Sequence, residues 1–97
     1  MKEPESNIRC FCHEHAPKPI DYQGDLHDLI GKEVKKGFPA ERAHLEHMWV
    51  KVIGVAKTDI PGKTVLVGTL DNDPYYTDKI KNGDLVIVQR EEIEAVL

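Results

Sequence analysis

The chain has few of the residue types on which common enzyme chemistries depend. Ser6 is the only serine, so no G-x-S-x-G nucleophile elbow exists. No G-x-G-x-x-G or Walker phosphate-binding loop is present, because the seven glycines are isolated turn or strand residues. Cys12 and His13 are adjacent in the chain, a spacing that rarely gives a productive thiolate–imidazole pair. These absences predict that the protein is not an enzyme.

Long apolar runs and an excess of positive charge are also missing. No run approaches the ~20 apolar residues that a membrane-spanning helix needs. The polar segment 1–7 lacks the hydrophobic region of a signal peptide. The net charge is −4, whereas proteins that bind duplex nucleic acid usually carry a basic stripe. We therefore expect a cytoplasmic protein that binds neither membranes nor nucleic acid.

Length and composition are those of one small globular domain. The chain has 97 residues, of which 40% are hydrophobic and 31% charged. Residues 1–8 are rich in charge and interrupted by Pro4, which predicts a flexible tail. We expect a single domain over residues 1–97.

The two cysteines, Cys10 and Cys12, are too close in sequence for a relaxed disulfide and are expected to be reduced thiols. They begin a segment of thiols and imidazoles, the ligand types that zinc prefers. The spacing is shorter than the C-x₂₋₄-C of structural zinc sites, and no second pair completes a tetrahedron. We therefore expect no cofactor. The alternative is a small zinc-binding protein that uses Cys10, Cys12, His13 and His15, with any further ligands from His27, His44 or His47.

Apolar runs in the second half predict three strands, at Trp49–Val55, Thr64–Leu70 and 84–89. The Pro-Gly turn within 59–63 and the Asn82-Gly83 dipeptide favour antiparallel connections between them. Ten residues of these runs and of the segment that follows are the predicted core: Trp49, Val50, Val52, Ile53, Val65, Val67, Leu70, Leu85, Ile87 and Ile93.

Two short helices are predicted beside these strands. One begins near Asp25 as N-cap, with Leu26, Leu29 and Ile30 spaced to face a core. The other covers about Ala40 to His47, after Pro39. The predicted fold class is therefore α+β: a small, twisted, mostly antiparallel sheet of four or five strands, curled like an SH3-type barrel, with the two helices against it.

Three motifs occur in a fixed order along the chain: Glu46-His47-Met48-Trp49-Val50, Gly68-x-Leu70-Asp71-Asn72-Asp73-Pro74 and Asn82-Gly83-Asp84. In this order they resemble a small bacterial family of domains of unknown function that includes YegJ-like proteins. The resemblance covers about residues 32–97. It implies a compact bacterial domain and assigns no catalytic residue.

The turn Asp71-Asn72-Asp73-Pro74 leads into two tyrosines. Asx side chains commonly stabilise such turns, so a structural role for Asp71 and Asn72 is favoured over catalysis or cation binding. Tyrosine is enriched in protein interfaces, and the alternation of an extended segment directs one of the pair inward. The hypothesis is a protein-binding surface made of Asp71, Asp73, Tyr75, Tyr76 and Asp78. Its acidity suits a basic partner, such as a toxin neutralised by an immunity-type protein.

Overall fold

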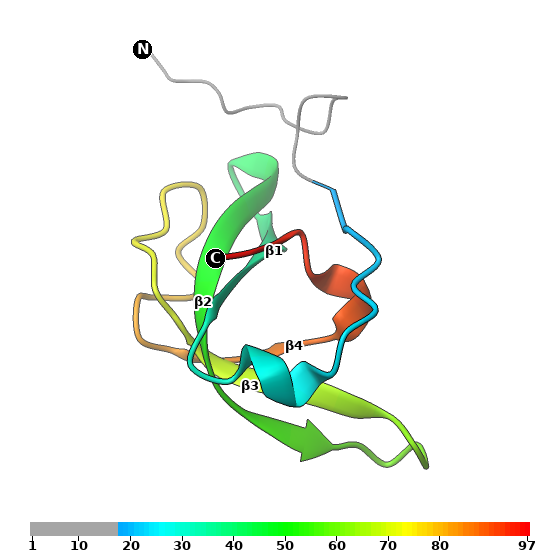
Figure 1. Ribbon diagram of the computed structural model, residues 1–97. Helices are drawn as coiled ribbons and strands as arrows, with labels where there is room; N and C mark the ends of the chain where they lie inside the picture. Colours follow the sequence, from blue (N-terminus) through cyan, green and yellow to red (C-terminus); the bar gives the residue numbers. More distant parts are fainter. Residues whose placement is uncertain (1–17) are drawn as a thin grey trace.

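The computed structural model describes residues 18–97, which form a five-stranded antiparallel sheet (Figure 1). The strands are β1 (Glu33–Ala40), β2 (Ala43–Lys57), β3 (Thr64–Leu70), β4 (Leu85–Val88) and β5 (Ala95–Val96). Two single 3-10 turns accompany them, η2 (Leu26–Leu29) and η3 (Arg90–Glu92). The order in the sheet is β4-β3-β2-β1-β5, so the chain crosses from one edge to the other through η3. The predicted tail at 1–8 and the Cys10–His15 segment lie outside the described residues.

The sheet curls because β2 is long enough to serve two neighbours. Its first half pairs with β1 and its second half with β3, and the register shifts at a bulge between Val52 and Gly54. A bulge increases the local twist, so the sheet bends around its inner face (Figure 1). That inner face holds a continuous core, with Val34 opposite Val50 and Leu66 opposite Val88.

The predicted fold class is wrong, because residues 18–97 contain no α-helix. The segment predicted as a helix over Ala40–His47 is the end of β1, a tight turn and the start of β2. Within it, Glu46 lies opposite Phe38 and His47 opposite Gly37. Alanine, glutamate and leucine favour a helix locally, but pairing with β1 supplies a partner for the backbone and overrides that weak preference.

The first predicted helix begins at the predicted residue but is a single 3-10 turn. The carboxylate of Asp25 accepts the His27 N–H at 2.9 Å, as an N-cap does. The turn then ends, because Gly31 has a φ of 88° and donates its N–H to the carbonyl oxygen of Val52 at 2.9 Å. Hydrogen bonding with β2 therefore begins before a second helical turn can form.

No helix within residues 18–97 has the length and apolar composition needed to cross a membrane.

The predicted core is correct for half of its ten residues. Five of its members are buried: Val50, Val52, Val65, Leu70 and Ile93. Trp49 and Val67 are half-buried. Three others lie on the outer face and are wrong as core residues, because no helix covers that face: Ile53 is 54% exposed, Leu85 68% and Ile87 50%. Leu26 and Leu29 are buried in the core as expected, whereas Ile30 is exposed. The core also includes six residues that were not predicted: Val34, Phe38, Met48, Leu66, Val86 and Val88.

Candidate functional site

The candidate site is the loop of residues 71–78 that follows β3, here named the tyrosine loop. It continues the hydrogen bonding between β2 and β3 beyond the end of the strand. The Asp71 N–H donates to the carbonyl oxygen of Trp49 at 2.9 Å, and the side-chain oxygen of Asn72 accepts the Trp49 N–H at 2.7 Å. Asn72 thus replaces a backbone carbonyl of the ladder. Its amide joins the loop to the sheet instead of capping its own turn.

Glu46 of β2 holds the middle of the tyrosine loop. Its two carboxylate oxygens accept the backbone N–H groups of Tyr75 at 2.6 Å and Tyr76 at 2.7 Å. Hydrogen bonds to an ionised carboxylate are shorter and stronger than those between neutral groups. The position of both tyrosines is therefore set by one side chain of the sheet.

The turn between β1 and β2 holds the far end of the loop. The Glu41 carboxylate accepts the Asp78 N–H at 2.8 Å and the Thr77 hydroxyl at 2.7 Å. These two donors, the backbone N–H first, hold the pKa of Glu41 below its ordinary value. Because Thr77 is only 3% exposed, its hydroxyl needs such a partner.

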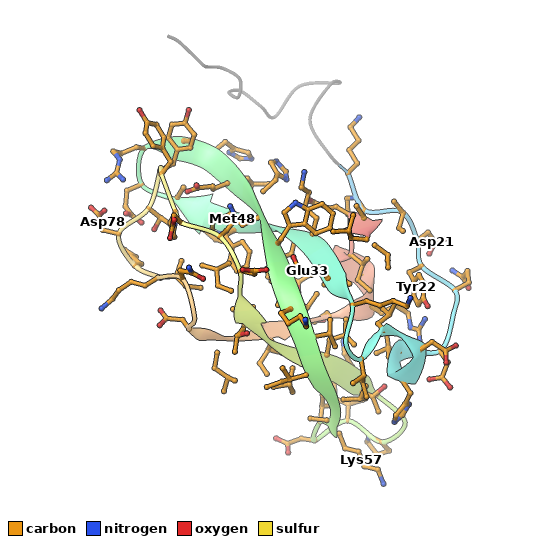
Figure 2. All side chains as sticks on the ribbon, turned by 60° about the vertical axis from the view of Figure 1, so that its left-hand side comes forward. Asp21, Tyr22, Glu33, Met48, Lys57 and Asp78 are labelled. Carbon is orange, nitrogen blue, oxygen red and sulfur yellow. The ribbon has the colours of Figure 1, made fainter. Side chains whose placement is uncertain are left out.

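Arg42 completes the attachment. Its guanidinium donates to the Tyr75 carbonyl oxygen at 2.7 Å and to the Asp78 carboxylate at 3.0 Å, and its backbone N–H donates to Tyr76 O at 3.1 Å. The Asp78 carboxylate raises the pKa of Arg42. We name Glu41, Arg42 and Glu46 together the hairpin clamp. Figure 2 shows that the clamped end of the molecule, marked by Asp78, lies opposite the end that carries Lys57.

The two tyrosines differ in exposure. Tyr75 is 73% exposed, whereas Tyr76 is half-buried. Their rings meet edge to face, with centroids 4.8 Å apart and an interplanar angle of 88°. This is a favoured geometry for aromatic pairs, so Tyr76 supports the ring that faces solvent.

The three predicted aspartates do not gather into one acidic face. Asp78 is exposed but paired with Arg42, whose positive charge lies beside its carboxylate. Asp71 interacts with Glu33 of β1. Three effects raise the pKa of Glu33: first a side-chain hydrogen bond with Asp71, then desolvation, then repulsion by the Asp71 charge. Asp71 and Asp73 are both exposed and neither forms an ion pair among the described residues, but only Asp73 has no interaction with another side chain there.

The clamp residues were not predicted from the sequence. Glu41, Arg42 and Glu46 bond to residues 29 to 37 positions further along the chain. The sequence predicted a helix over about Ala40 to His47, and charged residues are common on the exposed face of a helix. Only the hairpin brings these side chains to the loop.

A second group of polar residues lies on β2 and just before β5. Nδ1 of His47 is 2.8 Å from Oε1 of Glu94, and the two side chains are only 12% and 5% exposed. Both pack beside Gly37, which has no side chain to displace them. Nε2 of His47 is buried and has no hydrogen-bond partner among the described residues. An unsatisfied buried nitrogen of this kind is costly and is unusual in proteins.

The predicted metal ligands are not brought together within the described residues. Cys10, Cys12, His13 and His15 lie outside residues 18–97, and inside that range no group of three or more potential ligands forms a metal-binding cluster. His27 is exposed and bonded to Asp25, and His44 is exposed on β2. Of the three histidines in this range, only His47 has a buried nitrogen without a partner.

Fold and site together define a small all-β domain whose sheet carries a clamped, tyrosine-bearing loop. The model of the family described as an uncharacterised protein conserved in bacteria (DUF2314) matches residues 26–96, and the chain belongs to this family. The predicted resemblance to an uncharacterised bacterial family is therefore confirmed. The match begins before residue 32 and does not address the comparison with YegJ-like proteins. A comparison with curated proteins and another with solved structures gave no match.

Proposed function

We propose that this domain is a non-enzymatic, cytoplasmic binding module that recognises another protein through the tyrosine loop. Tyr75 carries the proposal, because a large aromatic ring is 73% exposed on a loop whose backbone is held by three side chains. Tyrosine supplies a large contact area with only two rotatable side-chain bonds. An exposed ring of this kind is a typical anchor of a protein interface.

The clamp lowers the cost of association. Ordering a mobile loop on binding costs conformational free energy, which reduces affinity. Here Glu46 fixes the backbone at Tyr75 and Tyr76, and Glu41 fixes it at Asp78, before any partner arrives. The partner therefore meets a surface that is already in place.

Charge favours a basic partner. Asp73 is exposed beside Tyr75, and the chain carries a net charge of −4. Complementary charge mainly accelerates encounter and improves specificity. A basic toxin neutralised by an immunity-type protein remains one partner with these properties.

The test is quantitative capture of proteins from bacterial lysate by the immobilised full chain, followed by mass spectrometry. The variants are Tyr75→Ala and Asp73→Ala. The matched control is Ile60→Ala, which removes another largely exposed hydrophobic side chain (60%) from a different loop. We expect a partner recovered by wild type and by the control but at least tenfold less by Tyr75→Ala. Equal recovery by all variants would reject the loop as the contact surface.

Metal binding is a second candidate function, favoured by the unpartnered Nε2 of His47. In many metal sites a ligating histidine donates its other ring N–H to a carboxylate, which fixes the tautomer. Glu94 holds Nδ1 of His47 in this way. The chain of Ile20 lies close by, since its N–H donates to the carbonyl oxygen of Ile93, the neighbour of Glu94. Cys12 is eight residues before Ile20, so the Cα atoms of these two residues are at most about 29 Å apart.

Titration of the reduced chain with Co²⁺ and Zn²⁺ tests this second candidate. Cobalt bound by thiolates gives charge-transfer bands, which report Cys10 and Cys12 directly. We expect His47→Ala to weaken zinc binding at least tenfold, and Glu94→Gln to weaken it about 10–100-fold. His44→Ala, an exposed histidine of the same strand, is the control. Absence of 1:1 zinc binding, or binding unchanged in His47→Ala, would reject the idea.

A further inference from the structure

The free edge of β4 is the starting point. β4 is the last strand of the sheet on the β3 side and has no neighbour on its other side among the described residues. Leu70 N–H donates to the Asp84 carbonyl oxygen at 2.9 Å, which shows that Asp84 directs its carbonyl group towards β3. Backbone direction alternates along a strand, so Leu85 and Ile87 direct their N–H and C=O groups away from β3, towards the open edge.

The backbone on either side of these two residues is already occupied. Before them, the Gly83 N–H donates to Leu70 O at 2.7 Å. After them, the Gln89 N–H donates to the Glu92 carboxylate at 2.9 Å, and the Glu92 N–H donates to Gln89 O at 2.9 Å. The edge that can accept another strand is therefore limited to the four backbone groups of Leu85 and Ile87.

The side chains at this edge form an uncharged patch. Leu85 (68% exposed) and Ile87 (50%) lie on the outer face of β4, with Val67 opposite Ile87 and with Ile53 (54%) on β2. Proteins usually protect an exposed edge with lysine, proline or a bulge. The four residues of β4 are Leu-Val-Ile-Val and have none of these devices.

We propose that β4 pairs with β4 of a second copy of this chain, antiparallel about a two-fold axis at Val86. In this register Leu85 of each copy lies opposite Ile87 of the other, so all four free groups of each edge form hydrogen bonds. A register centred on Ile87 would need the backbone of Gln89, which η3 already uses, and a register centred on Leu85 would need the Gly83 N–H, which already donates to Leu70 O. A shift of one residue would place the outer face of one strand opposite the inner face of the other. The edge is therefore complementary to itself in one register only.

The same pairing joins the two apolar patches. Leu85 of one copy contacts Ile87 of the other on the outer face, and Ile53 and Val67 of both copies flank them. Each patch exposes an area on the order of 300–400 Å², which is smaller than the ~800 Å² per partner of a standard interface. The dimer is therefore weak, with a Kd of roughly 0.1 mM. Each copy has a net charge of −4, so added salt strengthens the association by screening repulsion.

Sedimentation of the full chain under reducing conditions, from 10 μM to 1 mM, tests the dimer. We expect a monomer–dimer equilibrium in wild type, and a monomer throughout in Ile87→Lys. Because the Ile87 side chain points to solvent, this variant is expected to keep the wild-type circular dichroism spectrum. Ile60→Lys, at a residue exposed to a similar degree in the loop between β2 and β3, is expected to dimerise like wild type. A wild-type chain that stays monomeric at 1 mM, or a dimer unaffected by Ile87→Lys, would overturn the proposal.

Cysteine cross-linking tests the register, in a chain that also carries Cys10→Ser and Cys12→Ser. Opposed residues of a hydrogen-bonded antiparallel pair have Cα atoms ≈ 5.5 Å apart, within disulfide range. The double variant Leu85→Cys/Ile87→Cys is expected to form a disulfide-linked dimer under mild oxidation. Each single variant is expected to cross-link at least tenfold less. Efficient cross-linking of Ile87→Cys alone would show a different register and refute the pairing about Val86.

Discussion

Removing the Glu46 carboxylate is expected to release the tyrosine loop from the sheet. Glu46→Ala deletes two charge-assisted hydrogen bonds, to Tyr75 N–H at 2.6 Å and Tyr76 N–H at 2.7 Å. Bonds to charged groups contribute ≈ 1.5–3 kcal/mol each when well shielded. Tyr75 is largely exposed, so water replaces part of the lost interaction. We therefore expect the free energy of unfolding to fall by about 2–3 kcal/mol, near the lower limit for two such bonds.

Thermal and urea unfolding, followed by circular dichroism, measure this loss. A change of 1 kcal/mol shifts Tm by roughly 4–8 °C in a domain of this size, so Glu46→Ala is expected to lower Tm by about 8–24 °C. Glu46→Gln keeps one acceptor oxygen and is expected to lose about 1–2 kcal/mol. The amide resonances of Tyr75 and Tyr76 report the loop directly, and both are expected to exchange faster with solvent in the alanine variant.

Glu91→Ala is the matched control. Glu91 is exposed, and its carboxylate lies 3.8 Å from Lys63, so its loss is expected to cost less than about 0.5 kcal/mol. If Glu46→Ala were as mild as this control and left the two tyrosine amides unchanged, the clamp would not hold the loop, and the argument for a fixed binding surface would fail.

Three further predictions follow from single contacts. Gly68→Ala is expected to destabilise the fold by roughly 1–3 kcal/mol in urea unfolding, because the new methyl group would overlap a β2 carbonyl oxygen; Gly54→Ala, with open space around it, is expected to be near neutral. The raised pKa of Glu33 means that its contribution to stability is present in acid and lost as pH rises through that pKa. Glu33→Gln or Asp71→Asn is therefore expected to raise Tm at pH 7, with no gain below pH ~4; no gain at either pH would rule out this repulsion. The lowered pKa of Glu41 has the opposite sign: its contribution is present above the ordinary value of about 4.3 and is lost as pH falls through the lowered one. NMR titration of the loop amides is expected to show this step at a pH below the ordinary value, and its persistence in Glu41→Gln would contradict the assignment.

Part of the fold could be predicted from the sequence, because some caps, turns and strands depend on neighbouring residues. Asp25 caps the turn that begins after it, as predicted, because an Asx carboxylate accepts N–H groups two residues away. The Pro-Gly and Asn-Gly dipeptides mark real turns, in which Gly62 and Gly83 have φ values of 80° and 92°. The strand from Thr64 and the second part of β2, predicted as Trp49–Val55, were recognised by their apolar residues; the start of β2 at Ala43 was not. Each of these features depends on residues within a few positions of one another.

Strand faces were less accessible to sequence reasoning. The run Leu85-Val86-Ile87-Val88 is apolar at every position, so alternation cannot tell inside from outside. Pairing with β3 places Val86 and Val88 in the core and leaves Leu85 and Ile87 on the surface. This orientation of β4 exposes the two apolar side chains at the edge from which we infer a dimer.

The sequence alone determined the antiparallel strands of the second half, their turns and the tyrosines at the end of β3. Only the tertiary structure decided that residues 40–47 form a hairpin, and that Glu41, Arg42 and Glu46 hold the loop. The reason is physical: a helix or a hairpin satisfies the same backbone groups, and the local preference between them is smaller than the gain from pairing with a neighbouring strand. Contacts between residues about 30 positions apart exist only after that pairing has set the register.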